Sequence, residues 1–263
     1  MNDDAIAPVV AVMMILVVVV TLFGIWNAIY LPGFKQQAEF EHLKGVELSF
    51  HKIDENIRNM IVLRRTGAMT ETIPLGGGDL IIHQARSGGN LTLGPEETVI
   101  TVSNTTFTIG SSLIPITYSP VSNFWLDQGY EWRYGIVNVT KGLVNTPRFY
   151  GNYSDAKREW FTGMVSREGD DIYLANVIVG DPSSVSGNGI AQVRIEGVLG
   201  VVLVARTEDP VNLTVETATD FGKKVNESVF LELGKYWNAD DQRYSVTGEN
   251  VPITLYNLTL SVR

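Results

Sequence analysis

Apolar residues at the start of the chain follow a pattern that no soluble fold needs. From residue 5 to residue 26 almost every side chain is aliphatic, and the first charge after Asp4 is Lys35. A helix over residues 6–31 extends roughly 40 Å at about 1.5 Å per residue, which is enough to cross a hydrocarbon core of about 30 Å. Because such a helix is apolar on every side, it has no single face to bury on a domain. The segment therefore predicts a helix held in a membrane or in a bundle of helices.

A second pattern begins after Pro32 and Gly33, a pair that predicts a kink or an interrupted turn. Apolar residues now recur at spacings of three and four with charged residues between them, as in an amphipathic helix with one buried face. We expect this helix to continue to Arg64 or Arg65 and to end before Gly67. Its apolar stripe is expected to dock on the rest of the chain through Leu43, Val46, Phe50, Ile53, Ile57 and Met60.

From Thr70 onward the apolar period becomes two, which is typical of strands. Strands are predicted near residues 80–82, 98–102, 106–109, 135–140, 172–179, 191–195, 198–204, 211–216, 243–246 and 253–262, with glycine, proline and aspartate clusters between them. The segment 198–204 is apolar throughout apart from Gly200, so we expect it to be covered on both faces. One further helix is predicted over residues 221–236.

These elements predict an α+β fold, in which a long N-terminal helix, first hydrophobic and then amphipathic, carries an antiparallel, jelly-roll-like β-sandwich head. The expected division is a short leader at 1–5, a hydrophobic transmembrane or filament-core helix at 6–31, an amphipathic helix at 32–67 and a head domain at 68–263.

Composition narrows the classes of partner. The formal net charge is -9 and the basic residues form no stripe, so we expect no nucleic-acid partner. Cysteine is absent, which excludes a disulfide framework and cysteine-ligated metal sites.

Glycosylation sequons indicate the compartment. Asn-x-Ser/Thr occurs at seven positions, whereas 17 Asn and 36 Ser plus Thr would give roughly two by chance. Lys35 alone, lying after the apolar span, favours a cytoplasmic head by the positive-inside rule, and we give the seven sequons more weight. The sequence thus predicts an extracellular glycoprotein with candidate glycan sites at Asn90, Asn104, Asn138, Asn152, Asn212, Asn226 and Asn257.

No catalytic or metal-binding pattern stands out. His42 and His51 lie nearly opposite each other around the predicted helix and cannot share a metal, and His83 is distant in sequence. A phosphate-binding loop, a nucleophile elbow and a zinc-protease motif are all absent from the sequence. We therefore expect neither an enzyme nor a cofactor.

An aromatic cluster is open to two interpretations. Tyr130, Trp132 and Tyr134 alternate along a predicted strand, after Phe124 and Trp125. They form either a surface that stacks on sugars or contacts another subunit, or the wall of the core that receives the amphipathic stripe.

Residues 4–13, Asp-Ala-Ile-Ala-Pro-Val-Val-Ala-Val-Met, resemble the N-termini of archaeal type IV pilin-like proteins. In that family a class III signal peptidase cuts after a small residue that follows a charged one, immediately before the apolar helix. Asp4, Ala5 and Ile6 match this pattern, which implies a cut between Ala5 and Ile6. The resemblance covers roughly residues 1–40; beyond them it rests on the architecture of a long helix carrying a β head. The sequence departs from the bacterial branch at Val10, where that branch has a glutamate.

The resemblance implies a non-enzymatic structural subunit of an archaeal type IV pilus-like cell-surface filament, with adhesion among the roles of such filaments. Its implied partners are further copies of itself in a helical homopolymer, the membrane before assembly, the class III signal peptidase and the pilus assembly machinery. A minor pilin that primes or caps filaments belongs to the same class. The alternatives are a monomeric membrane-anchored surface glycoprotein whose head binds carbohydrate or cell wall, and an anchored surface enzyme.

Overall fold

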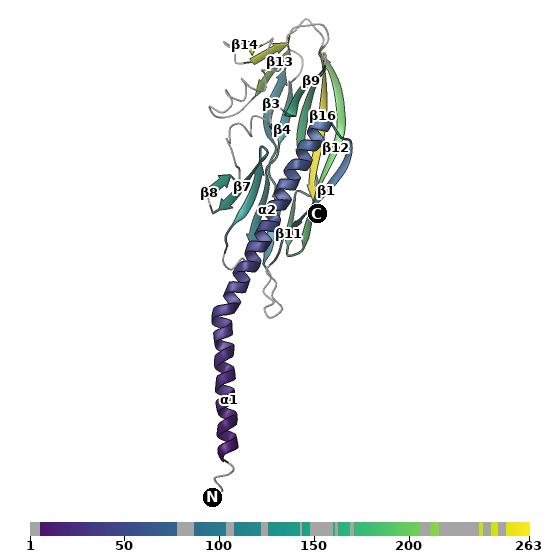
Figure 1. Ribbon diagram of the computed structural model, residues 1–263. Coiled ribbons are helices and arrows are strands. Elements are labelled where there is room, and N and C mark those ends of the chain that lie inside the picture. Colours follow the sequence, from purple (N-terminus) through teal and green to yellow (C-terminus); the bar gives the residue numbers. More distant parts are fainter. Residues whose placement is uncertain are drawn as a thin grey trace.

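The computed structural model describes residues 6–77, 87–103, 108–121, 126–142, 144–147, 160, 163–168, 171–205, 211–215, 237–238, 243–246 and 251–263. It has the predicted α+β composition: a long N-terminal helical rod followed by a head of mostly antiparallel strands (Figure 1). The rod extends away from the head, and the N-terminus lies at its far tip.

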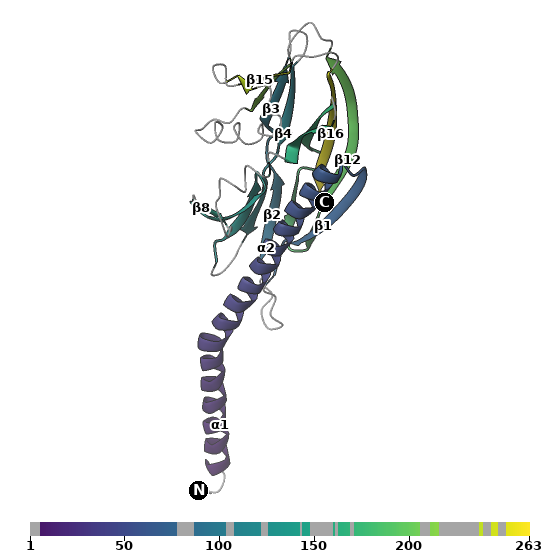
Figure 2. The ribbon, with the colours of Figure 1, turned by 45° about the horizontal axis from the view of Figure 1, so that its top comes forward.

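The rod consists of three helical segments in direct succession. They are α1 (Ile6–Ile25), the π-helical turn η2 (Trp26–Tyr30) and α2 (Leu31–Leu63). At η2 the Leu31 N–H donates to the Trp26 carbonyl, five residues back, and Pro32 follows in the first turn of α2. A proline ring collides with the carbonyl four residues before it in a regular α-helix, and a wider turn relieves that collision. The kink expected at Pro32 is therefore present, and the rod changes direction there (Figure 2).

Helix α2 ends at Leu63, slightly earlier than the sequence predicts. Arg64 adopts a left-handed conformation with φ 48°, and its N–H donates to the Ile61 carbonyl. The Arg65 N–H returns to the Met60 carbonyl at 3.2 Å, which satisfies a second free carbonyl at the helix end. The chain then enters the head at Gly67, whose φ of 115° suits only glycine.

The described strands make up three sheets. In chain order they are β1 Gly67–Pro74, β2 Gly88–Leu93, β3 Glu97–Ser103, β4 Thr108–Leu113, β5 Ile116–Val121, β6 Gly129–Arg133, β7 Ile136–Lys141, β8 Val144–Pro147, β9 Val165–Glu168, β10 Asp171–Val179, β11 Ser184–Gly187, β12 Ile190–Ala205, β13 Val211–Val215, β14 Trp237–Asn238, β15 Arg243–Val246 and β16 Val251–Val262. The first sheet has the order β1-β12-β16-β10-β9, the second β11-β2-β5-β6-β7-β8 and the third β14-β15-β13-β3-β4. Strands β10 and β16 pair in parallel, and the other described pairs are antiparallel.

Helix α2 lies between the first and second sheets and belongs to the core of the head. It contacts β1, β12 and β16 on one side and β6 and β7 on the other (Figure 1). Its buried face forms one apolar cluster with side chains of both sheets, among them Tyr118, Trp132, Ile195 and Leu258. The third sheet is joined to the first where the Ser112 N–H donates to Asn176 Oδ1 at 2.8 Å.

Strand β12 differs from its prediction in two ways. The segments expected as two strands, 191–195 and 198–204, form a single strand with a register shift between Leu199 and Val202. Val198, Leu199 and Val202 are about half exposed, so the expectation that this segment is covered on both faces is wrong at these positions. These positions lie beyond the end of the neighbouring strand, because β1 pairs with β12 only as far as Gly67 opposite Gly197.

Some predictions are not addressed by the described structure. The strand expected at 80–82 and the helix expected at 221–236 lie outside the described residues. The sandwich and jelly-roll arrangement of the head stays a prediction.

A tight hairpin between β6 and β7 places the aromatic strand β6. Arg133 pairs with Ile136, so the turn consists of Tyr134 and Gly135, whose φ values are 52° and 71°. Two positive φ values in a two-residue loop are the geometry of a type I′ turn. A Cβ on Gly135 would stand 1.9 Å from Trp160 Cδ1, so this glycine is required both by the backbone and by packing.

We predict that Gly135→Ala destabilises the protein by several kcal/mol, and that Gly142→Ala serves as its control. Both glycines have positive φ, but a Cβ on Gly142 meets no atom within 4 Å. Gly142→Ala should lower the free energy of unfolding by about 1–2 kcal/mol, the conformational cost of alanine at positive φ. Gly135→Ala should lower it by about 1–3 kcal/mol more, because its Cβ also collides with Trp160. Thermal unfolding of the full chain in detergent measures the difference, and equal losses in the two variants would contradict the packing role.

Candidate functional site

The most unusual surface of the molecule is helix α1. Its large apolar side chains from Val9 to Ile25 are 45–66% exposed, on all sides of the helix. In the described part of the chain, one helix is long and apolar enough to cross a membrane, and α1 is its apolar portion. The intramolecular fold leaves this surface bare, so its partner has to come from outside the subunit.

Thr21 and Asn27 each donate one hydrogen bond to the backbone of the rod itself. Thr21 Oγ1 donates to the Val17 carbonyl at 2.6 Å, and Asn27 Nδ2 donates to the Phe23 carbonyl at 3.0 Å. Such back-bonding removes the cost of placing a hydroxyl or amide proton in an apolar environment. The rod is therefore compatible with lipid or a dry helical bundle along its apolar length.

Ile6, the expected first residue of the processed chain, is also the first residue of α1. Asp4 and Ala5, the other two residues of the expected processing site, lie outside the described residues.

The six residues expected to dock α2 are all buried, each at most 2% exposed: Leu43, Val46, Phe50, Ile53, Ile57 and Met60. They pack in the same cluster as the inward-facing residues of the first and second sheets. Fully burying an aliphatic side chain contributes about 1.5–3 kcal/mol, so this stripe alone holds the rod firmly to the head.

Polar residues beside the stripe bind the polar ends of aromatic side chains in the second sheet. Asp54 Oδ1 accepts a hydrogen bond from Trp132 Nε1 at 2.8 Å, and Arg58 lies 3.5 Å from its other oxygen. Glu47 Oε2 accepts from the Tyr130 hydroxyl at 3.3 Å, and the Tyr130 ring lies 6.1 Å from the ring of Phe50. The junction is thus apolar in its centre and hydrogen-bonded along its side. Periodicity could not reveal these pairs, because their helix partners have the composition of a solvated face.

His42 makes the third contact of this kind. The Tyr118 hydroxyl donates its single proton to the Leu75 carbonyl at 3.0 Å, so His42 Nε2, also 3.0 Å away, is the donor to the Tyr118 oxygen. Burial lowers the pKa of His42 below its ordinary value, and nearby Glu39 opposes that effect. Glu39 is itself buried, and its Oε2 accepts from the Leu126 N–H at 3.2 Å.

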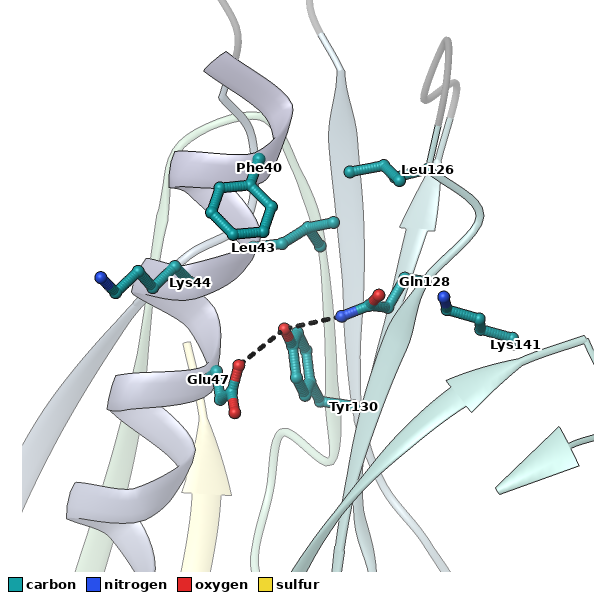
Figure 3. A pocket seen from close by; sticks show the side chains of 8 residues that line it. All are labelled: Phe40, Leu43, Lys44, Glu47, Leu126, Gln128, Tyr130 and Lys141. Atoms are coloured by element: carbon teal, nitrogen blue, oxygen red, sulfur yellow. Dashed lines mark hydrogen bonds between the residues drawn. The ribbon is translucent and has the colours of Figure 1, made fainter. Parts of the chain in front are cut away.

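A groove of about 450 Å³ opens between α2 and strands β6 and β7 (Figure 3). The Tyr130 hydroxyl lies in this groove between Glu47 and Gln128. Gln128 Nε2 donates a hydrogen bond to the Tyr130 hydroxyl at 2.9 Å. Its lining residues are Phe40, Leu43, Lys44, Glu47, Leu126, Gln128, Tyr130 and Lys141.

The aromatic strand β6 is the wall that receives the helix. Tyr130 and Trp132 are 1% and 0% exposed, and Tyr134 is partly buried against the core with its hydroxyl on Glu97 at 2.5 Å. The interpretation of Tyr130 and Trp132 as a sugar-stacking or subunit-contact surface is therefore wrong, because neither ring has a face open to solvent. Phe124 and Trp125 lie outside the described residues.

The C-terminal end of α2 is anchored on the first sheet. Arg64 Nη2 donates to Ser166 Oγ at 3.0 Å, and its guanidinium lies 3.6 Å above the Tyr173 ring. The Tyr256 hydroxyl donates to the Arg65 carbonyl. Gly197 permits this approach, since a Cβ there would collide with Tyr256 and Arg65.

The sequons occupy unequal positions. Asn90 and Asn257 are half-buried on strands, and their Oδ1 atoms accept from Ser186 Oγ and Asn176 Nδ2 respectively. Asn138 is 6% exposed, so in the folded head its amide is not presented for a glycan. Asn212 lies on β13. Asn104, Asn152 and Asn226 lie outside the described residues.

Among the residues that the structure describes, no group of three or more His, Asp and Glu side chains could hold a metal ion. His42 and His51 differ in exposure as well as in direction, His42 being half-buried and His51 exposed.

Comparisons with models of known protein families, with curated proteins and with solved structures found no match.

We predict that Asp54→Ala destabilises the protein by about 1–3 kcal/mol, because it leaves the buried Trp132 N–H without its acceptor. Asp54→Asn is the matched control, because its Oδ1 can still accept that hydrogen bond. Burial raises the pKa of Asp54, against the hydrogen bond from Trp132 and the charge of Arg58, so removing the charge relieves a desolvation penalty. Denaturant unfolding at pH 7 should place the Asn variant close to the wild type. A loss as large as that of the Ala variant would show that the charge, not the hydrogen bond, holds the junction.

The lowered pKa of His42 predicts a pH-dependent stability. Below its ordinary value of 6.5, the unfolded chain protonates His42 more readily than the folded chain does. The stability therefore falls as the pH drops through 6.5 toward the lowered folded pKa, and is retained at higher pH. The free energy of unfolding, measured with denaturant between pH 5 and 8, should depend less steeply on pH in His42→Gln than in the wild type. The same dependence in both proteins would contradict this role.

Proposed function

We propose that the protein is a structural subunit of an archaeal type IV pilus-like surface filament. In this proposal α1 forms the filament core with further copies of the chain, and the β head forms the outer wall. The observation that carries the proposal is that α1 projects from the head with its apolar surface exposed on all sides, while α2 is locked into the head by a separate stripe. A subunit of this shape can exchange the surroundings of α1 without repacking its head.

The free energy of α1 in its different surroundings favours assembly into a filament over release of the subunit into water. Exposing the apolar side chains of α1 to water costs on the order of tens of kcal/mol. Moving them from lipid into a bundle of equally apolar helices is nearly balanced, because both surroundings are hydrocarbon. Extraction from the membrane therefore needs work from a pilus assembly machinery, and the finished filament holds together without lipid.

The remaining features of the proposal follow the same logic. A class III signal peptidase frees Ile6 as the first residue of the mature chain. The head then stands outside the cell and carries glycans on sequons other than the buried Asn138, and adhesion is a role of the resulting surface. The burial of Tyr130 and Trp132 weighs against the alternative of a monomeric anchored protein that uses these aromatics to bind carbohydrate.

We expect Val17→Asp to abolish filaments while the protein stays in the membrane with a folded head. Val17 is 63% exposed near the middle of α1, where every neighbour in a helical bundle is apolar. A single aspartate costs about 2.5–3.5 kcal/mol in a membrane helix, which the rest of α1 outweighs, but it recurs in every subunit of a bundle. Electron microscopy of surface filaments, membrane fractionation and near-UV circular dichroism give the three readouts. Val17→Leu is the control and should assemble, and normal filaments from Val17→Asp would refute the proposal.

The mature N-terminus separates the filament subunit from a simple membrane anchor. Mass spectrometry of the protein isolated from its own cells should find Ile6 as the first residue. An intact Met1, together with detergent-solubilised material that stays monomeric, would support the anchored monomer instead.

A further inference from the structure

Three aromatic side chains form an exposed ladder at the point where the apolar rod ends. The rings of Trp26 and Tyr30 stack with centroids 5.3 Å apart, and the ring of Phe34 lies 6.2 Å from that of Trp26. Their exposed fractions are 43%, 53% and 47%, so the ladder is not part of the core. The wider turn of η2 contributes to the alignment, because it offsets the drift that residues four apart show around a regular α-helix.

The position of the ladder matches the dimensions of a bilayer. Helix α1 has 20 residues and so extends about 30 Å, the thickness of the hydrocarbon core. Trp26 follows α1 directly; the backbone at Phe34 lies about 12 Å further along the rod. The Phe34 ring reaches back to within 6.2 Å of the Trp26 ring, so the aromatic face lies at the end of the span of α1, at the level of the polar headgroup layer. Lys35, Gln36 and Gln37 come next, and Glu39 is the first buried residue of α2.

We infer that the face formed by Trp26, Tyr30 and Phe34 is an interfacial lipid-binding surface that sets the depth of the subunit in the membrane before assembly. Tryptophan and tyrosine favour the headgroup level, because their rings are apolar while their N–H and O–H groups stay hydrated. The ladder holds α1 across the hydrocarbon and places the α2–head junction just outside the headgroups. The inference rests on the membrane-held form within the proposed function, and filament formation is not needed for it.

Depth-dependent quenching tests this position in the unassembled, full-length protein reconstituted into phosphatidylcholine vesicles. The fluorescence of Trp26 is obtained by subtracting that of Trp26→Phe, which removes the signal of the head tryptophans. Two further variants in the Trp26→Phe background, Leu22→Trp and Phe34→Trp, supply a deeper and a shallower reference. Lipids brominated near the bilayer centre should quench position 22 most, position 26 less and position 34 least, whereas lipids brominated near the headgroups should quench position 26 strongly.

A second comparison tests whether the aromatic rings themselves set the depth. Replacing Tyr30 and Phe34 together by leucine keeps the face apolar but removes its preference for the interface. We expect the Trp26 signal to shift toward the quenching pattern of position 22. Phe40→Leu, an exposed aromatic outside the ladder, is the control and should leave the pattern unchanged.

Three results would overturn the inference. Trp26 could be quenched as deeply as position 22, it could respond only to a quencher dissolved in water, or its depth could be unchanged in the Tyr30 and Phe34 double variant. Each result is obtained without filaments, so it is distinct from a failure of Val17→Asp to block assembly.

Discussion

The incompatibility of helix α1 with water governs this molecule. Hydration of a rod that is apolar all round would cost far more than the stability of a typical folded domain, which is about 5–15 kcal/mol. The protein resolves this outside its own fold, since the head leaves α1 bare from Pro8 to Ile25. Thr21 and Asn27 each donate a hydrogen bond to the helix backbone, which lowers the cost of placing them in apolar surroundings. Lipid and other copies of the rod are the two surroundings that meet the same requirement.

The junction between α2 and the head gives the exposed rod a defined direction. The apolar stripe binds the helix to the head, but apolar contacts are not directional and so specify register and rotation less sharply than hydrogen bonds do. The hydrogen bonds of His42, Glu47 and Asp54 to Tyr118, Tyr130 and Trp132 are directional and fix both register and rotation. Arg64 on Tyr173 holds the far end of the helix. Any force on α1 is thereby transmitted to the head through α2, which suits the proposed role of a filament subunit.

Two local departures from regular backbone geometry set the direction of the rod and of strand β6. The π-turn η2 accommodates Pro32 and bends the rod between its apolar portion and its docked portion. The type I′ turn at Tyr134 and Gly135 aims the aromatic strand β6 at the helix, with Trp160 packed against the glycine. At the type I′ turn, glycine is required both by the backbone geometry and by the neighbouring ring of Trp160.

The sequence by itself determined the elements whose signal is periodic and local. The all-round apolar segment, the stripe from Leu43 to Met60 and about half of the described strands can be read from spacing, because burial of one face imposes a period on the chain. Only the tertiary structure decided which polar residues beside the stripe are buried, since Asp54 and Glu47 acquire their roles from strands some 80 residues away. The same holds for the half-exposed part of β12, which lies beyond the end of β1, and for Asn138, whose sequon lies in a buried strand. Local patterns record what a segment needs to bury, but the identity of its neighbour is a property of the assembled fold.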